Sequence, residues 1–153
     1  MFKPIRREAM PIRKRSSTVI LATEELTVRY DKLDRQAFGE VLSMSGFIST
    51  PNRRVPLVDV DRSTVRNVVG SVTNIRVDRG RLLGELSWAR GQRARDTEAK
   101  YNDGHIDHVE VEVKPVELQL DLSGKRFDGE VRVIRKWSII VAILRPARES
   151  IFT

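Results

Sequence analysis

The chain of 153 residues has no cysteine, only two histidines and few aromatic residues. The absence of cysteine excludes disulfides, thiolate zinc sites and cysteine nucleophiles, and we expect a reducing compartment. The longest apolar run is the six residues 139–144, far short of the roughly 20 that a membrane-spanning helix needs. The basic start also lacks the apolar segment of a secretory signal, because only VILA at 19–22 follows it. We therefore expect a soluble, non-exported protein without a membrane partner.

Positive charge is concentrated at the start of the chain. Residues 1–16 hold six Lys or Arg and one Glu, so they carry +5 of the formal net charge of +7 and the rest of the chain carries +2. With two prolines and little apolar periodicity, this segment predicts an extended arm that binds nucleic acid or an acidic protein surface; a solvated tail is the alternative. The binding residues would be Lys3, Arg6, Arg7, Arg13, Lys14 and Arg15. We divide the chain into this arm (1–16) and one domain (17–153).

Alternation of apolar and polar residues dominates after residue 17, which predicts a mainly β domain of the α+β class. Strands are expected near 18–30, 40–48, 55–60, 69–78, 81–88, 106–121 and 130–145. Two short flanking helices are expected. One spans Thr64 to Val69 and is opened by Asp61 or Ser63 as its cap. The other spans about Gln92 to Asn102, where Ala94, Thr97 and Tyr101 share a face.

The expected strand at 106–121 changes the phase of its alternation at Pro115. Because a one-residue slip swaps the two faces, and because proline lacks a ladder amide, this predicts a bulged, bent strand of the kind that turns a corner in a small barrel. The run SIIVAIL at 138–144 is apolar on both faces, which is typical of a central buried strand. Trp137 before it is expected in the core.

Both histidines lie in the stretch HIDHVEVEVKP at 105–115. On a regular strand His108, Glu110 and Glu112 face one way, and His105 and Asp107 face the other. The first three could form a metal face, to which Asp59 and Asp61 could add ligands. Alternating polar residues are more typical of a solvated strand face, so we expect no metal and no cofactor.

The order of these pieces resembles the prohead (head maturation) proteases of tailed phages over about residues 18–148. The segments that carry the resemblance are EVLSMSGF at 40–47, VPLVDVDRSTVRNVVGSVTNIRVDRGRLLGEL at 55–86, GHIDHVEVEV at 104–113 and KWSIIVAILRPA at 136–147. The resemblance implies a herpesvirus-protease-like antiparallel β-barrel with flanking helices. It also implies a serine nucleophile with a histidine base that cuts scaffold and capsid proteins.

The decisive positions depart from that pattern. No histidine stands just before Asp61, where the family has its base, and Glu110 occupies the place of the serine. Glu112 replaces a small residue that approaches the substrate. The resemblance therefore implies a degenerate site at Glu110, Glu112, His108 and Asp61 with no catalytic residue. We expect Glu110 and Glu112 to be solvated or to pair with basic residues such as Arg53 and Arg54.

These observations predict a pseudo-protease that is a structural or assembly component of a tailed-phage particle. Its partners would be capsid, portal or tail-side subunits, a second copy of the chain or nucleic acid bound by the arm. It would be located in the virion or in the assembling particle in the host cytoplasm. An active maturation protease and a nucleic-acid-binding protein are the alternatives.

Overall fold

The computed structural model describes residues 15–49, 53–60 and 64–147. The strands are β1 (Thr18–Thr23), β2 (Thr27–Asp31), β3 (Gln36–Leu42), β4 (Val55–Val58), β5 (Val68–Asp78), β6 (Arg81–Trp88), β7 (Ile106–Asp121) and β8 (Val131–Pro146). The α-helix is α1 (Gln92–Asn102), and two 3₁₀ turns are η2 (Met44–Gly46) and η3 (Val65–Asn67). The described residues are thus mainly β, as the alternation predicted, and they contain one α-helix.

All strands belong to one sheet with the order β1-β6-β5-β4-β8-β3-β2, and β7 pairs with β8. The expectation of an antiparallel sheet is wrong, because β8 pairs in parallel with both β3 and β4. The alternation of apolar and polar residues within a strand does not reveal which strands it pairs with or in which direction. Within the described residues the hydrogen-bonded path is open, so a closed barrel is not confirmed.

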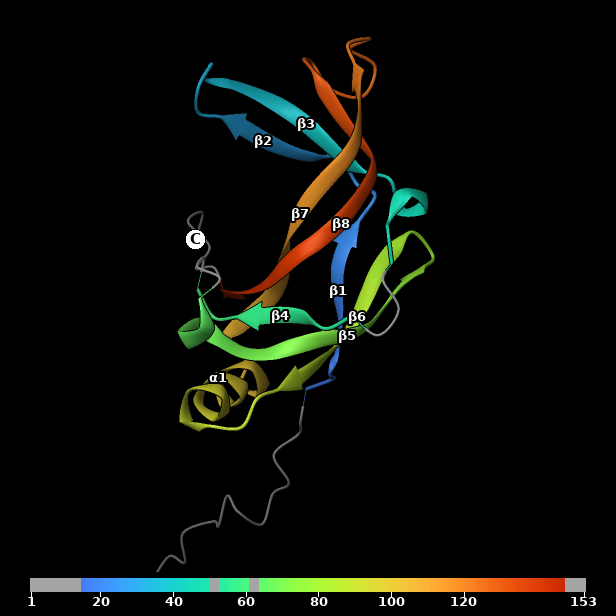
Figure 1. Cartoon of the computed structure of the whole chain (residues 1–153). Coiled ribbons are helices and arrows are strands. Elements are labelled where there is room, and N and C mark those ends of the chain that lie inside the picture. Colours follow the sequence, from blue (N-terminus) through green and yellow to red (C-terminus); the bar gives the residue numbers. More distant parts are fainter. Residues whose placement is uncertain (1–14, 50–52, 61–63, 148–153) are drawn as a thin grey trace, which may run out of the picture.

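β7 and β8 form a long antiparallel hairpin that runs the length of the molecule (Figure 1). The end of the hairpin with the β7–β8 turn lies beside β2 and β3 (Figure 1). The other end, where β7 begins and β8 ends, lies beside β4, β5 and α1 (Figure 1). The register of the hairpin shifts on both sides of Glu117, directly after Pro115. The bulged strand predicted from the phase change is therefore confirmed, and the bulges let one hairpin serve both ends of the molecule.

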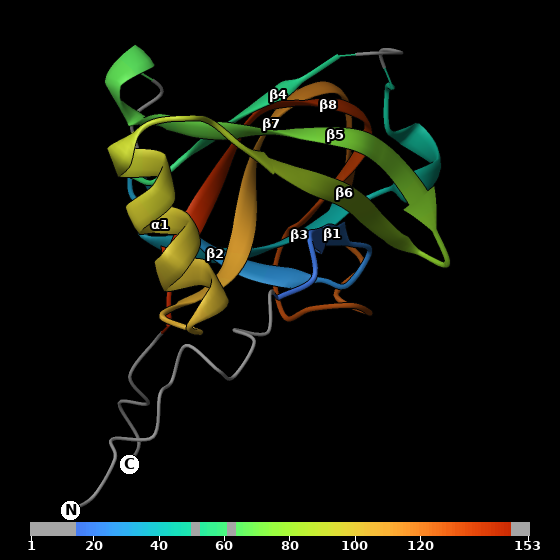
Figure 2. The same cartoon turned by 90° about the horizontal axis from the view of Figure 1, so that it is seen from below.

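The core lies inside the curved sheet, and α1 packs at one end of that sheet (Figure 2). Its residues come from β1, η2, β4 to β8 and α1, and the fully buried Trp137 is the largest of them. A second small apolar cluster, formed by Val58, Val141 and Ile143, lies on the other face of β4 and β8. Apolar burial on both faces confirms β8 as a central strand, although Ile140 is exposed.

Two predicted strands are interrupted in the structure. The segment 18–30 divides into β1 and β2, because the backbone N–H of Met44 donates to the Glu24 carboxylate at the bend (2.6 Å). The segment 40–48 ends at Leu42 and continues as η2, which brings Gly46 against the Arg135 carbonyl. A Cβ at position 46 would lie 1.5 Å from that oxygen, so only glycine fits there.

The helix α1 has the predicted bounds, and Ala94, Thr97 and Tyr101 are its buried residues. Gly104 follows it with a φ of 84°, the conformation that ends many helices. The other predicted helix is only the 3₁₀ turn η3. The residues expected to cap it, Asp61 and Ser63, lie outside the described residues.

Candidate functional site

The start of β7 brings together two of the residues that the sequence places in the degenerate site. His108 lies opposite Arg145 of β8, and Glu110 lies opposite Ile143. Because directly opposed residues share a face, His108, Glu110 and Arg145 stand beside the small apolar cluster on the face away from the main core. On this face β7 contributes polar side chains, whereas β8 contributes the apolar Ile143 and the cationic Arg145.

Glu110 is held from two sides. Arg145 donates from Nε to Oε2 of Glu110 at 2.8 Å, and Nε2 of His108 lies 3.3 Å from Oε1. Burial alone would raise the pKa of Glu110, but the hydrogen bonds from Arg145 and His108 outweigh burial and lower that pKa below its ordinary value. Glu110 is therefore an ionised carboxylate at neutral pH, which excludes a general-acid role there.

The ring of His108 lies between two carboxylates, because its Nδ1 is also 3.3 Å from Oδ2 of Asp107. The sequence placed Asp107 on the opposite face. That placement is wrong because the register shifts between Ile106 and His108, so the two neighbours are not in regular alternation. A neutral imidazole can donate to only one of these carboxylates, whereas an imidazolium donates to both.

Glu112, the third residue of the degenerate site on β7, is exposed opposite Val141 and is not part of this network. Asp61 lies outside the described residues. Glu110 pairs with Arg145 rather than with Arg53 or Arg54. Sequence reasoning missed Arg145, because the register of the β7–β8 hairpin alone brings it to Glu110; the one available signal was its place near the end of the expected last strand.

The structure gives the possible metal face no support. Within residues 15–49, 53–60 and 64–147 no group of three or more His, Asp or Glu side chains could hold a metal ion. Asp59 is instead paired with α1, where Arg93 donates from Nε (2.6 Å) and from Nη2 (2.8 Å) to its two oxygens. This bidentate pair ties the end of β4 to the first turn of α1.

The last cation of the basic arm is used inside the domain. Arg15 donates to the carbonyl oxygens of Tyr101 (3.3 Å), Ile106 and Asp107 (2.8 Å), and its guanidinium carbon lies 4.4 Å from the centre of the Tyr101 ring. Tyr101 in turn donates from Oη to the carbonyl of Ser16 at 2.8 Å. The other five cations, Lys3, Arg6, Arg7, Arg13 and Lys14, lie outside the described residues.

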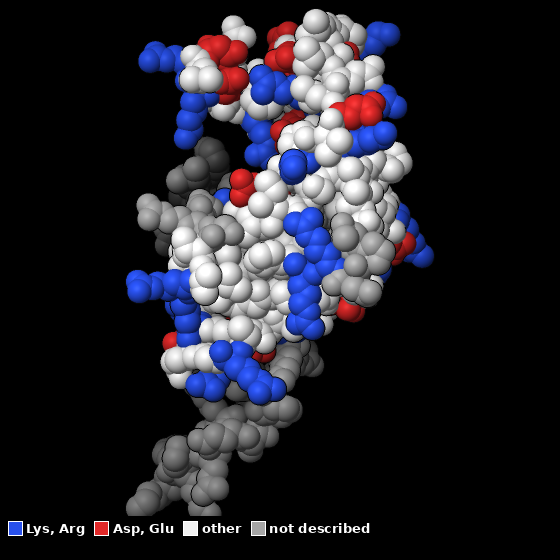
Figure 3. Space-filling view, in the orientation of Figure 1, with Lys and Arg blue, Asp and Glu red and all other residues white. Residues whose placement is uncertain are grey.

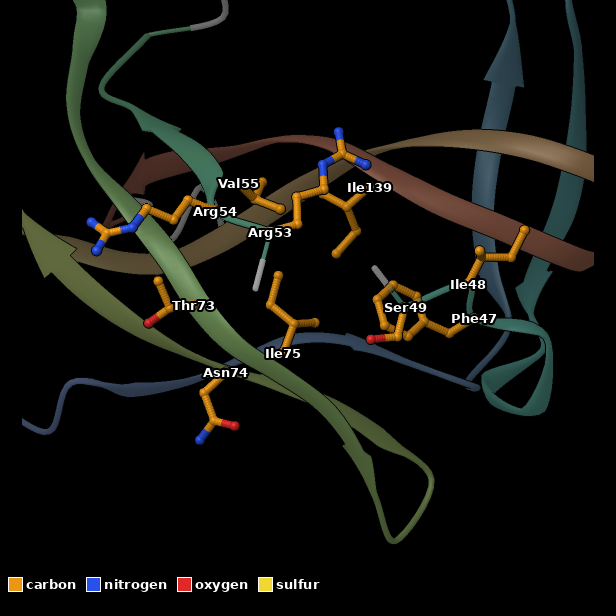
Figure 4. A pocket seen from close by; sticks show the side chains of 10 residues that line it. All are labelled: Phe47, Ile48, Ser49, Arg53, Arg54, Val55, Thr73, Asn74, Ile75 and Ile139. Carbon is orange, nitrogen blue, oxygen red and sulfur yellow. The ribbon is translucent and has the colours of Figure 1, made fainter. Parts of the chain in front are cut away.

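A hollow of about 550 Å³ lies where β8 changes its partner (Figure 4). β3 pairs with β8 as far as Ile134, Phe47 bridges to Trp137, and β4 begins to pair at Ala142. Ile139 lies between these points and forms part of the hollow. Its other lining residues are Phe47, Ile48, Ser49, Arg53, Arg54, Val55, Thr73, Asn74 and Ile75.

The hollow combines an apolar interior with two cations. Val55, Ile75 and Ile139 point toward one another, while Arg53 and Arg54 lie at the border (Figure 4). Both arginines are exposed, and neither forms an ion pair with a described residue. Such a site fits a chain segment in which an acidic side chain stands next to an apolar one.

At the other end of the molecule, over β2, β3 and the tip of the β7–β8 hairpin, acidic and basic side chains are interspersed (Figure 3). A smaller hollow of about 300 Å³ lies there, lined by Asp31, Asp34, Gln36, Ala37, Phe38, Asp128, Gly129, Glu130 and Arg132. Arg132 lies over the Phe38 ring and pairs with Asp31 and Glu130. These contacts join β2 and β8 across β3.

Comparisons with protein-family models, with curated proteins and with solved structures found no match to this chain. The resemblance to prohead proteases therefore stays a prediction from the sequence. No helix in the described part of the chain is long and apolar enough to cross a membrane.

Proposed function

We propose that the chain is a non-catalytic relative of the prohead proteases and serves as a structural or assembly component of a tailed-phage particle. The observation that supports this proposal is the Arg145–Glu110 pair between β8 and β7. In the resemblance Glu110 stands where the nucleophile would be. An ionised carboxylate at that position repels the negative charge that develops on a substrate carbonyl during acyl transfer.

The herpesvirus-protease-like barrel belongs to the same proposal. Its support is the curved sheet around the main core, with α1 packed at one end. The mixed order of the strands would then be the form that this fold takes in a chain without a substrate groove.

The partners in this proposal are capsid, portal or tail-side subunits. The hollow at Arg53 and Arg54 is the surface that best suits an acidic, partly apolar segment of such a subunit. A structural component remains in the particle in a fixed ratio, whereas a maturation protease cuts itself and leaves.

The test is to quantify the chain by mass spectrometry in purified mature particles and in early assembly intermediates. We expect an uncut chain in a constant ratio to the capsid protein. Scaffold and capsid proteins incubated with the purified chain should stay intact. Recovery only from early intermediates, or specific scaffold cleavage that Glu110→Ala abolishes, would contradict the proposal and favour an active protease.

Binding of nucleic acid by the arm is a second candidate function. It is favoured by the +5 charge of residues 1–16, which contrasts with +2 for the other 137 residues. Because Arg15 already binds backbone carbonyls of the domain, the five preceding cations would make the phosphate contacts.

A further inference from the structure

The second half of β7 carries an exposed apolar row. Val116, Leu118, Leu120 and Leu122 are 58%, 52%, 49% and 74% exposed, and we call these four residues the β7 stripe. Three large apolar side chains at alternate positions of β7, followed by Leu122 directly after its last residue, differ from the scattered exposed residues that any protein surface has.

The stripe lies on a free sheet edge. β7 pairs with β8 on one side, and within the described residues no strand pairs with its other side. Pro115 and the bulges beside Glu117 interrupt the edge at its middle, but from Leu118 to Asp121 the register with β8 is regular. An edge that is regular, unpaired and apolar on one face is a template for another strand.

The sequence of this segment is complementary to itself when two copies pair antiparallel, with Gln119 of one copy opposite Gln119 of the other. In that register Leu118 of one copy opposes Leu120 of the other, and Val116 and Leu122 stand at the two ends of the contact, outside its regular part. Apolar residues thus meet apolar residues on one face, which is what a two-fold symmetric contact requires.

The other face would bring Glu117 of one copy opposite Asp121 of its partner. Each of these carboxylates has a cation from its own chain, since Lys136 lies 3.5 Å from Glu117 and Arg126 lies 3.6 Å from Asp121. The two carboxylates therefore approach with their charges balanced, and Lys136 of one copy can also attract Asp121 of the other.

We propose that two copies of the chain pair antiparallel through the outer edges of β7, centred on Gln119, so that their sheets join into one. This inference goes beyond the proposed function and holds whether or not the chain belongs to a phage particle. A contact made by one edge strand is smaller than the ~1,200–2,000 Å² of standard interfaces, so we expect micromolar rather than nanomolar dissociation.

This register can be tested with two double variants that differ only in the charge placed at position 120. Leu118→Lys with Leu120→Lys would bring like charges face to face across the two-fold axis, whereas Leu118→Lys with Leu120→Glu would bring opposite charges together. Sedimentation over the micromolar range should show a dissociation constant raised at least about tenfold in the first variant, and a dimer largely retained in the second. Val28→Lys, an equally exposed position on β2, should not change the constant.

Because the chain has no cysteine, a second measurement is independent of stability. Gln119→Cys should form an intermolecular disulfide quickly, because the two thiols meet at the axis. Val28→Cys is the control and should cross-link slowly. A monomeric wild-type chain, equal sedimentation of the two double variants, or equal cross-linking at positions 119 and 28 would overturn the inference.

Discussion

Arg145 and Glu110 join β8 to β7 through a 2.8 Å ion pair. Glu110 stands at the position to which the resemblance to prohead proteases assigns the nucleophile. The pair lies on the face of the small cluster of Val58, Val141 and Ile143. Both side chains are partly exposed, so the pair contributes less to stability than a buried one would. Its larger consequence is to fix a negative charge at this site.

The stabilisation by this pair should depend on pH. The pKa of Glu110 is lowered in the folded chain, so the stabilisation is present above the ordinary value of 4.5 and is lost as the pH falls through the folded value. We expect Glu110→Gln to be less stable than the wild type at neutral pH, and the difference to shrink at about pH 3. Urea unfolding at both pH values measures it.

Glu112→Gln is the matched control for that experiment, because Glu112 is on the same strand and exposed. It should differ little from the wild type at either pH. An equal pH dependence of the two variants would mean that the Arg145–Glu110 pair does not stabilise the fold.

Replacing Glu110 by serine should not create a peptidase. A serine hydroxyl ends two bonds short of the Glu110 carboxylate oxygens, and His108 Nε2 is already 3.3 Å from the nearer of them. The hydroxyl would therefore lie beyond the roughly 2.6–3.2 Å that a base needs. Scaffold protein incubated with Glu110→Ser should remain uncut, and cleavage above the wild-type level would show that His108 can act as the base.

The sequence predicted β5, β6, β7, β8 and α1 nearly to the residue, because each has a clear period and an end marked by glycine, aspartate or a phase change. The Asp78–Arg79–Gly80 turn is an example, since Arg79 and Gly80 both have positive φ values. Local periodicity cannot reveal which strands pair. The parallel contacts of β8 with β3 and β4 were therefore not predicted.

The same limit applies to the candidate site. The strand His108 to Glu112 could be identified as a polar face, but its partner Arg145 lies 35 residues from Glu110 and is placed by the hairpin register. The bulge that turns Asp107 toward His108 has no mark in the composition. The hollow depends on where β8 exchanges β3 for β4, which only the topology determines.

Trp137 should be the more important of the two tryptophans for stability. It is fully buried, packs on Phe47 with ring centres 5.1 Å apart, and donates from Nε1 to the Ser43 carbonyl at 2.8 Å. Trp137→Phe leaves a cavity and removes the indole hydrogen bond to the Ser43 carbonyl, which then keeps only the Gly46 N–H, so we expect a loss of about 2–4 kcal/mol in the free energy of unfolding. The half-buried Trp88 is the control. Circular dichroism in urea should show a smaller loss for Trp88→Phe, and equal losses would contradict the prediction.

Arg15 should act as an anchor for the start of the domain. Arg15→Ala removes its bonds to backbone carbonyls and its contact with the Tyr101 ring, so we expect a loss of about 1–2 kcal/mol in the free energy of unfolding. Arg15→Lys keeps the charge but not the planar fork and should recover only part of it. Thermal unfolding compares these variants with Arg95→Ala, because the Arg95 side chain bonds to Gln92 and to no other residue in the described part of the chain. A loss no larger than that of Arg95→Ala would show that the anchor contributes nothing.

In the nucleic-acid-binding alternative, the arm binds duplex DNA through the cations before Arg15. These are Lys3, Arg6, Arg7, Arg13 and Lys14. Five phosphate contacts predict a slope of about −4.5 for log K against log salt concentration, at about −0.9 per phosphate. Fluorescence anisotropy over a salt series measures this slope.

Replacing all five cations by alanine should abolish the binding, whereas Arg15→Ala should leave the slope unchanged, because that guanidinium is already bound to the domain. An acidic protein partner would give a weaker salt dependence and a loss specific to that partner when residues 2–14 are deleted. If the deletion changes neither DNA binding nor particle assembly, the arm is a passive tail. If Arg15→Ala reduces the magnitude of the slope as much as replacing any one of the five arm cations does, Arg15 leaves its carbonyl partners to reach phosphate.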